Sequence, residues 1–147
     1  MNTREGRVGV KGVGVDVVDL GAFAASMAEP GTRFAGVFSA TERRQARDAA
    51  ERRGAPGDLA RHLGARWAAK EAFIKAWSEA LYGQPPPIAP EEVRWPEISV
   101  VSDAWGRPAI RLGGRIADAV RASIGEVQIN ISLSHERETA TAYCVLS

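Results

Sequence analysis

Residues 58–81 read DLARHLGARWAAKEAFIKAWSEAL, and this stretch decides the fold. Apolar side chains recur along it every three or four residues, the spacing that places them on one face of a helix. They are Leu59, Leu63, Trp67, Ile74, Trp77 and Leu81. The spacing predicts one long helix with a buried stripe, followed by an extended connection that Pro85-Pro86-Pro87 imposes.

Shorter apolar segments on both sides of this helix predict β-strands. In the first segment Val13, Val15 and Val17 recur at the two-residue period of a strand. This alternation slips near Gly12, so we expect a bulge or a late start of the strand. The later segments form two hairpins, the second of which turns through residues 134–138. The predicted strands span residues 8–20, 98–101, 108–112, 126–133 and 139–146.

Other segments have the signatures of helices. Ser39 and Glu42 form a capping box, in which the serine hydroxyl and the glutamate carboxylate accept backbone N–H groups at the start of a helix. The predicted helices span residues 21–28, 40–53 and 114–122. Strands and helices are mixed without a regular βαβ rhythm. We therefore predict the α+β class, with residues 1–147 as a single domain and a mainly antiparallel sheet packed on the long helix.

Composition excludes several classes of protein. The chain has 147 residues, 45% hydrophobic and 25% charged, and a formal net charge of +1, which does not favour a nucleic-acid binder. The single cysteine, Cys144, excludes an internal disulfide, and no apolar run reaches the ~20 residues that span a bilayer. We therefore expect a cytoplasmic protein without a membrane partner. Residues 31–70 carry eight Arg and one Lys against four acidic residues. This basic excess indicates either a solvated helical surface or a docking surface for an acidic partner or a phosphorylated ligand.

Four residues could carry chemistry, and each also has a purely structural interpretation. Asp16 interrupts a valine strand, so it is either an exposed edge residue or a metal ligand. Glu71 and Lys75 lie four residues apart and can form a surface ion pair, although Trp67 one turn earlier makes this face less polar. His135 ends a predicted strand, where a lone histidine is more often structural than catalytic.

The order of three motifs along the chain is more specific than any one of them. They are GVGVDVV at 12–18, RWAAKEAFIKA at 66–76 and ISLSH at 131–135, supported by Phe34, the capped segment 38–42 and the turn Gly106-Arg107-Pro108. Together they resemble the phosphopantetheinyl transferases, specifically the short holo-[acyl-carrier-protein] synthase group. The resemblance extends from about Val8 to Leu146.

This resemblance implies an enzyme of fatty acid biosynthesis. Such enzymes transfer the 4′-phosphopantetheine of coenzyme A to a serine of an apo acyl carrier protein and release adenosine 3′,5′-bisphosphate. Coenzyme A is then the co-substrate and the acyl carrier protein the partner. The resemblance assigns Asp16 and Glu71 as ligands of magnesium, which prefers carboxylate, phosphate and water oxygens. It places Lys75 at the pyrophosphate, where an ammonium stabilises the leaving group as a point charge.

The same resemblance implies further site residues and an assembly. His135 contacts a phosphate, while Arg66, Arg107 and Pro108 lie nearer the 3′-phosphate and the adenine. Glu136 is the candidate general base that accepts the serine proton. Short members of the group form trimers whose active sites are shared between neighbouring subunits, so we expect a homotrimer.

Two departures from the group's pattern affect these expectations. Residues 21–28 lack the arginines with which the first helix usually meets the acidic carrier. The candidates for carrier docking are instead Arg33, Arg43, Arg44 and Arg47. Residues 78–84 stand where the group commonly has a glycine-rich stretch, and Gly83 is a poor equivalent for its phosphate contacts.

Two other functions remain open at this point. A magnesium-dependent nucleotide pyrophosphohydrolase would need the same acidic and basic groups, but it would need no protein acceptor. An inactive carrier-binding module would need none of them. The intact set Asp16, Glu71, Lys75 and His135 favours the transferase.

Overall fold

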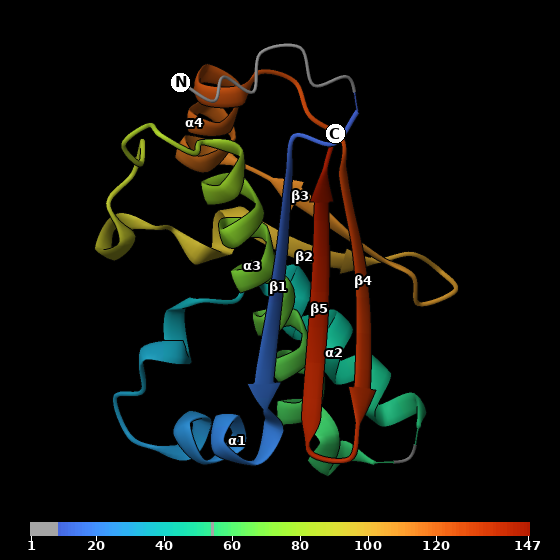
Figure 1. The fold of residues 1–147 in the computed structure, drawn as a ribbon. Helices are drawn as coiled ribbons and strands as arrows, with labels where there is room; N and C mark the ends of the chain where they lie inside the picture. The colour runs from blue at the N-terminus through green and yellow to red at the C-terminus, as the bar shows by residue number, and fades with distance from the viewer. Residues whose placement is uncertain (1–8, 54) are drawn as a thin grey trace.

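The computed structural model describes residues 9–53 and 55–147. Its main sheet is antiparallel, in the order β1-β5-β4, and the long helix α3 runs along one face of this sheet (Figure 1). A two-stranded hairpin, β2-β3, lies behind the main sheet in this view. The strands are β1 (Gly12–Asp19), β2 (Ile98–Ser102), β3 (Pro108–Leu112), β4 (Ile129–Glu136) and β5 (Thr139–Leu146). The α-helices are α1 (Leu20–Ala28), α2 (Ala40–Arg52), α3 (Leu59–Ala80) and α4 (Gly114–Ile124).

The predicted α+β class and antiparallel pairing are confirmed. The capping box is also confirmed, because the Ser39 hydroxyl accepts the Glu42 N–H and the Glu42 carboxylate accepts the Ser39 N–H at the start of α2. Short 3₁₀ turns complete the connections. They are η1 (Arg33–Gly36), η2 (Pro56–Asp58), η3 (Pro90–Glu92) and η4 (Trp95–Glu97).

The first strand and the strand predicted at 126–133, which runs from Ile129 to Glu136, differ most from their predicted boundaries. The first strand starts late, at Gly12, and ends at Asp19, whose carboxylate caps α1; the predicted start at Val8 lies outside the described residues. The predicted turn at 134–138 is wrong, because β4 continues pairing with β5 through Glu136. The chain then reverses through two residues, the first of which, Arg137, has a left-handed φ of 53°. His135 therefore lies within a strand.

Two glycines of β1 allow α3 to approach the sheet at backbone distance. A Cβ atom at Gly14 would overlap the Ala72 carbonyl oxygen, and one at Gly12 would overlap that of Ala76. Both glycines are buried under the helix. This close packing brings the charged side chains of α3 next to Asp16, which lies on the same strand.

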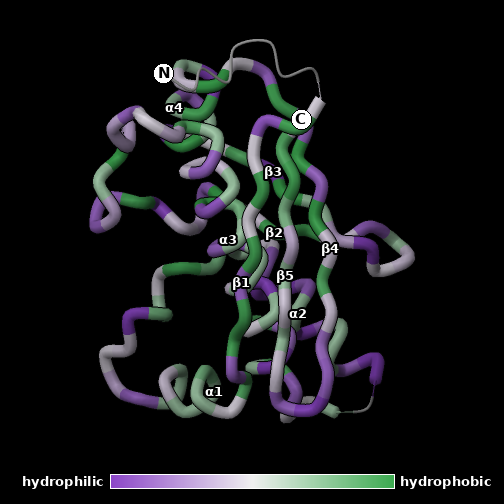
Figure 2. The backbone as a smooth tube through the Cα atoms, viewed as in Figure 1, coloured by the Kyte–Doolittle hydropathy of each residue, from purple (hydrophilic) through white to green (hydrophobic). Residues whose placement is uncertain are grey.

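The opposite face of the main sheet is uncovered and partly apolar. Val13, Val15 and Val17 of β1 and Tyr143 of β5 are exposed, and Val15 pairs directly with Tyr143. Figure 2 shows hydrophobic residues along β1, and no helix lies between the main sheet and the viewer. Isolated exposed apolar residues are normal, whereas a contiguous strip of this kind marks an interaction surface.

Candidate functional site

The first group of predicted site residues lies where β1 meets α3. Asp16 Oδ1 is 3.0 Å from Lys75 Nζ, and the same ammonium donates to the Val15 carbonyl oxygen at 3.0 Å. The Asp16 side chain is 16% exposed, whereas that of Lys75 is 53% exposed and can reach a ligand in solvent. Asp16 is thus a shielded, paired carboxylate and not a solvated edge residue.

Glu71 faces this pair from the middle of α3. Burial and the nearby Asp16 carboxylate raise the pKa of Glu71, while the Lys75 and Arg33 cations oppose the shift. The simple Glu71–Lys75 ion pair that their spacing allows is not formed among the described residues, since Lys75 turns to Asp16. Two neighbouring carboxylates in a half-buried place repel each other unless a cation lies between them.

The chemistry of these two carboxylates fits magnesium. In the described residues no group of three or more His, Cys, Asp or Glu side chains could form a complete protein cage for a metal. Magnesium is typically held by one or two carboxylates together with substrate phosphates and water. Asp16 and Glu71 would therefore supply the protein's share of its ligands.

Arg33 is a further cation beside Glu71. Its guanidinium carbon lies 4.6 Å from the centroid of the Phe34 ring and 5.9 Å from that of Trp67, one helical turn before Glu71. The Arg33 side chain is exposed, so these rings orient the charge without removing it from solvent.

The second group of predicted residues lines a cavity of about 280 Å³ between α2, α3, β4 and the β2-β3 hairpin. Arg66, Pro108 and His135 all contribute to its wall. Three further basic residues line the same cavity, and the sequence analysis did not identify them as phosphate-binding candidates. They are Arg53, Arg61 and His62. Of these three, His62 could have been found from the sequence, because it precedes Arg66 by four residues and so lies on the same face of α3.

Arg66 is the most informative residue of the cavity. It is only 7% exposed, and its Nε has no hydrogen-bond partner among the described residues. One terminal nitrogen, Nη1, donates to the His62 carbonyl oxygen at 3.3 Å. Burial lowers the pKa of Arg66, with Glu42 opposing, yet a guanidinium remains protonated in proteins. A buried cation with a free donor beside a cavity is suited to an anion.

His62 has a lowered pKa. Burial is the main cause, followed by the Arg66 and Arg53 cations and, more weakly, by His135, while Asp58 acts in the opposite direction. The imidazole is therefore mostly neutral at pH 7, and a bound anion would favour its protonated form.

The two groups lie on different sides of the molecule. Arg66 and Glu71 are five residues apart on α3, which separates them by about 140° around the helix axis. Asp16 belongs to β1 at one edge of the main sheet, and His135 belongs to β4 at the other edge. Within the single chain, the predicted carboxylates and the predicted phosphate-binding residues therefore form two separate groups.

Two predicted site residues lie outside both groups. The Arg107 side chain is exposed and pairs with Asp103, 2.6 Å from Nε to Oδ2, although its neighbours Gly106 and Pro108 line the cavity. Glu136 is exposed and follows His135 in β4, so the two side chains point to opposite faces of the strand. The role of Glu136 as a general base stays a prediction.

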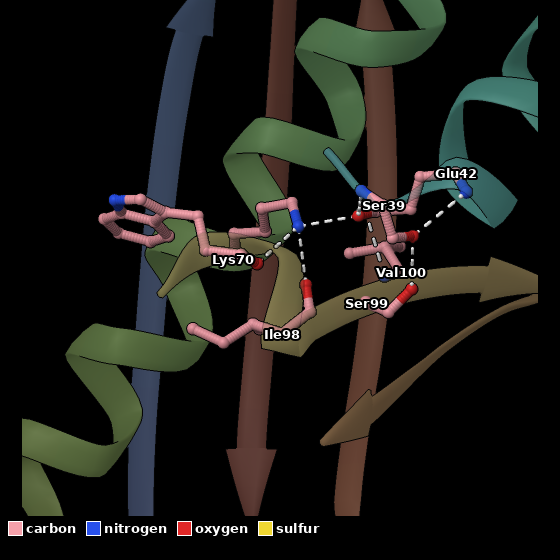
Figure 3. Close-up of polar contacts among 7 residues, drawn as sticks. Ser39, Glu42, Lys70, Ile98, Ser99 and Val100 are labelled. Carbon is pink, nitrogen blue, oxygen red and sulfur yellow. Dashed lines mark hydrogen bonds and ion pairs between the residues drawn. The ribbon is translucent and has the colours of Figure 1, made fainter. Parts of the chain in front are cut away.

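A fully buried ion pair between Lys70 and Glu42 connects α3 to α2 and β2 (Figure 3). Lys70 Nζ donates to Glu42 Oε1 at 2.7 Å and to the carbonyl oxygens of Trp95 and Ile98 at 2.8 and 2.7 Å. The other carboxylate oxygen of Glu42 accepts the Val100 N–H at 3.1 Å. The sequence analysis missed this contact; its signal was the gap at position 70 in the apolar stripe of α3.

Known proteins resemble this chain in sequence and in overall fold. Residues 12–144 match the 4′-phosphopantetheinyl transferase superfamily. A holo-[acyl-carrier-protein] synthase of Corynebacterium glutamicum (strain R) is 53% identical over 135 residues, which cover 92% of this chain and 96% of that protein. A solved ACPS–CoA complex of Chronobacterium ammoniagenes superimposes with a TM-score of 0.83 at 47% identity, covering 92% and 95% of the two chains. The acyl carrier protein synthase of Mycobacterium tuberculosis gives 0.71 at 40% identity, covering 95% and 98%.

The chain belongs to the 4′-phosphopantetheinyl transferase superfamily. Within this superfamily it is similar to holo-[acyl-carrier-protein] synthases over most of its length, so the resemblance inferred from the three motifs is confirmed. No helix in the described part of the chain is long and apolar enough to cross a membrane.

Proposed function

We propose that this protein transfers the 4′-phosphopantetheine of coenzyme A to a serine of an apo acyl carrier protein. The observation that carries the proposal is the pairing of two kinds of site in one chain. The carboxylates of Asp16 and Glu71 lie beside an exposed lysine, and the cavity holds the buried guanidinium of Arg66. Coenzyme A presents a pyrophosphate for the carboxylates and the lysine, and a separate 3′-phosphate for the cavity.

The chain's own residues account for much of the reaction. The serine oxygen attacks the phosphorus that carries pantetheine, the P–O bond within the pyrophosphate breaks, and adenosine 3′,5′-bisphosphate leaves. The Lys75 ammonium neutralises charge on the departing phosphate. Arg66 and His135 hold the 3′-phosphate and so fix the nucleotide end. Glu136 is the predicted acceptor of the serine proton. Magnesium, held by Asp16 and Glu71, would supply positive charge at the pyrophosphate oxygens.

The separation of the two groups supports the predicted homotrimer with shared active sites. If the carboxylates of one subunit meet the cavity of its neighbour, each interface contains one complete site. A cyclic arrangement of this kind uses a heterologous interface that closes on itself. The uncovered strip Val13, Val15, Val17 and Tyr143 offers an apolar surface for it. A cytoplasmic location and a place in fatty acid biosynthesis accompany this proposal as predictions.

Several exposed basic side chains fit an acidic carrier protein. Arg33 is exposed beside Glu71, and Arg44 and Arg47 are exposed on α2. Arg43, in contrast, donates to the Ala35 carbonyl oxygen and so is engaged within the chain. We therefore expect Arg33 to contribute most directly to carrier docking.

The reaction is tested by the intact mass of a purified apo acyl carrier protein after incubation with this protein, coenzyme A and magnesium. The expected result is a gain of one phosphopantetheine, lost with chelator and with Asp16→Ala. Consumption of coenzyme A without a gain in carrier mass would instead indicate the pyrophosphohydrolase. Intact coenzyme A with unmodified carrier would indicate an inactive binding module.

The shared site is tested by co-expressing two inactive variants, Asp16→Ala and Arg66→Ala, under separate affinity tags. In randomly mixed trimers about one quarter of the sites combine an intact carboxylate group with an intact cavity, so about one quarter of the activity returns. The control mixes wild-type chains equally with the double variant. Shared sites predict about one quarter of the activity in that control, whereas sites within single subunits predict about one half.

A further inference from the structure

Three buried charged side chains form one cluster where α2, α3 and β2 meet. Lys70 and Glu42 are 0% exposed, and Arg66 is 7% exposed. Arg66 precedes Lys70 by four residues, so the two cations lie one turn apart on the same face of α3. Two cations and one carboxylate leave the cluster with an excess of one positive charge. A buried net charge is unfavourable until an opposite charge lies beside it.

The Glu42 carboxylate is occupied by groups other than Arg66 (Figure 3). Its Oε1 accepts the Ser39 N–H at 2.9 Å and Lys70 Nζ at 2.7 Å. Its Oε2 accepts the Val100 N–H at 3.1 Å. These bonds use three of the roughly four lone-pair positions of a carboxylate and fix its orientation. The ammonium of Lys70 is the cation that directly neutralises it.

Arg66 is left available to the cavity. Its Nε has no hydrogen-bond partner among the described residues, and Nη1 donates only to the His62 carbonyl oxygen, at 3.3 Å. Val100 lines the same cavity, so the Glu42 carboxylate that holds its N–H lies directly behind the cavity wall. The carboxylate therefore acts on Arg66 from behind the wall, while an anion in the cavity would act on it from the front.

We propose that Lys70 is a positioning residue for this cavity: by neutralising Glu42, it keeps the Arg66 guanidinium free to bind an anion. Lys70 is not among the described residues that line the cavity, so it acts through Glu42 and not on the anion itself. Without Lys70, the charge of the cluster falls to zero, and the Glu42 charge offsets the attraction of Arg66 for an anion. The inference concerns any small anion and does not depend on the proposed reaction with coenzyme A.

The test is a titration of the full-length protein with inorganic phosphate at fixed pH. It is followed by the NMR signals of the His62 and His135 imidazoles, because both residues line the cavity. For Lys70→Met we expect the dissociation constant of phosphate to rise about tenfold, because one buried positive charge is lost near the site. Glu42→Gln/Lys70→Met should return close to the wild-type value, because Arg66 then has no buried carboxylate to offset it.

Glu42→Gln alone separates positioning from structural support. Both single variants break the buried pair and lose stability, so a purely supporting role predicts weaker phosphate binding in both. The proposal predicts opposite results. Burial already lowers the pKa of Lys70, and Glu42 opposes that shift. Even if Lys70 loses its proton in Glu42→Gln, Arg66 keeps one positive charge, so this variant should bind phosphate at least as tightly as wild type.

Ile116→Ala is the control for loss of stability. Ile116 is 0% exposed on α4 and is not among the described residues of the cavity wall, so its truncation destabilises the core while the dissociation constant stays at the wild-type value. An unchanged constant in Lys70→Met would overturn the proposal, as would weaker binding in Glu42→Gln or in the double variant. The Glu42→Gln result decides if Lys70→Met does not fold. A wild-type protein without a saturable response to phosphate would overturn the proposal as well.

Discussion

Lys70→Met tests whether the buried contact with Glu42 holds the two sides of α3 in place. Both side chains are 0% exposed. Lys70 donates three hydrogen bonds, one to Glu42 and two to backbone carbonyl oxygens. Methionine fills a similar volume but removes the charge and the donors. Glu42 would then keep the N–H groups of Ser39 and Val100 as partners, with no cation beside its buried carboxylate.

The expected cost follows from that uncompensated charge. Breaking a buried pair from one side destabilises by about 3–5 kcal/mol. The Trp95 and Ile98 carbonyl oxygens, which lose their donor, are part of this cost. The whole domain is stable by only about 5–15 kcal/mol, so the variant loses a large fraction of its free energy of unfolding. Removing the second charge as well, in Glu42→Gln/Lys70→Met, should recover about 1–4 kcal/mol.

The assay is urea unfolding followed by circular dichroism, at one fixed protein concentration because assembly contributes to apparent stability. The midpoints of wild type, both single variants and the double variant give the coupling energy between Lys70 and Glu42. A Lys70→Met variant within about 1 kcal/mol of wild type would refute the argument. A double variant less stable than Lys70→Met would refute it too, since the carboxylate charge would then not be the source of the loss.

Three shorter predictions concern docking, proton uptake and packing. Arg33→Glu should raise the KM for the carrier several-fold and flatten its salt dependence, whereas Arg111→Glu should do neither in the same steady-state assay. Because burial and nearby cations lower the pKa of His62, phosphate binding should take up protons near pH 6–7; calorimetry in buffers of different ionisation enthalpy should show this uptake, reduced in His62→Gln. Gly14→Ala should cost about 1–3 kcal/mol in urea unfolding because its Cβ would overlap the Ala72 carbonyl, while Gly36→Ala, with open space around it, should not.

Most of the fold could be predicted because its signals are local. The apolar spacing of α3, the capping box at Ser39 and the alternation of the strands each depend on residues a few positions apart. The error at residues 134–138 has the same origin. Polar residues suggested a long turn, but backbone pairing with β5 continued through Glu136 and left a two-residue reversal.

The site could be predicted only in part because its geometry is long-range. The sequence motifs identified Asp16, Glu71, Lys75, Arg66 and His135 one at a time. Their division into two groups depends on the strand order β1-β5-β4, which no local pattern encodes. Burial of Lys70 could be suspected from its place in the apolar stripe, but its partner lies 28 residues away on another helix.

The separated site and the uncovered sheet face have a common explanation. The carboxylate group and the cavity lie on different sides of α3, so the proposed shared site would pair the carboxylates of one copy with the cavity of another. The strip Val13, Val15, Val17 and Tyr143 exposes apolar surface that an isolated subunit would leave in water. In the proposed homotrimer, burial of that strip against a second copy would stabilise the assembly through the hydrophobic effect, and the same contact would complete the site. Glycine at positions 12 and 14 fits this arrangement: it seats α3 tightly on one face of β1, and the larger valines are left to the other face.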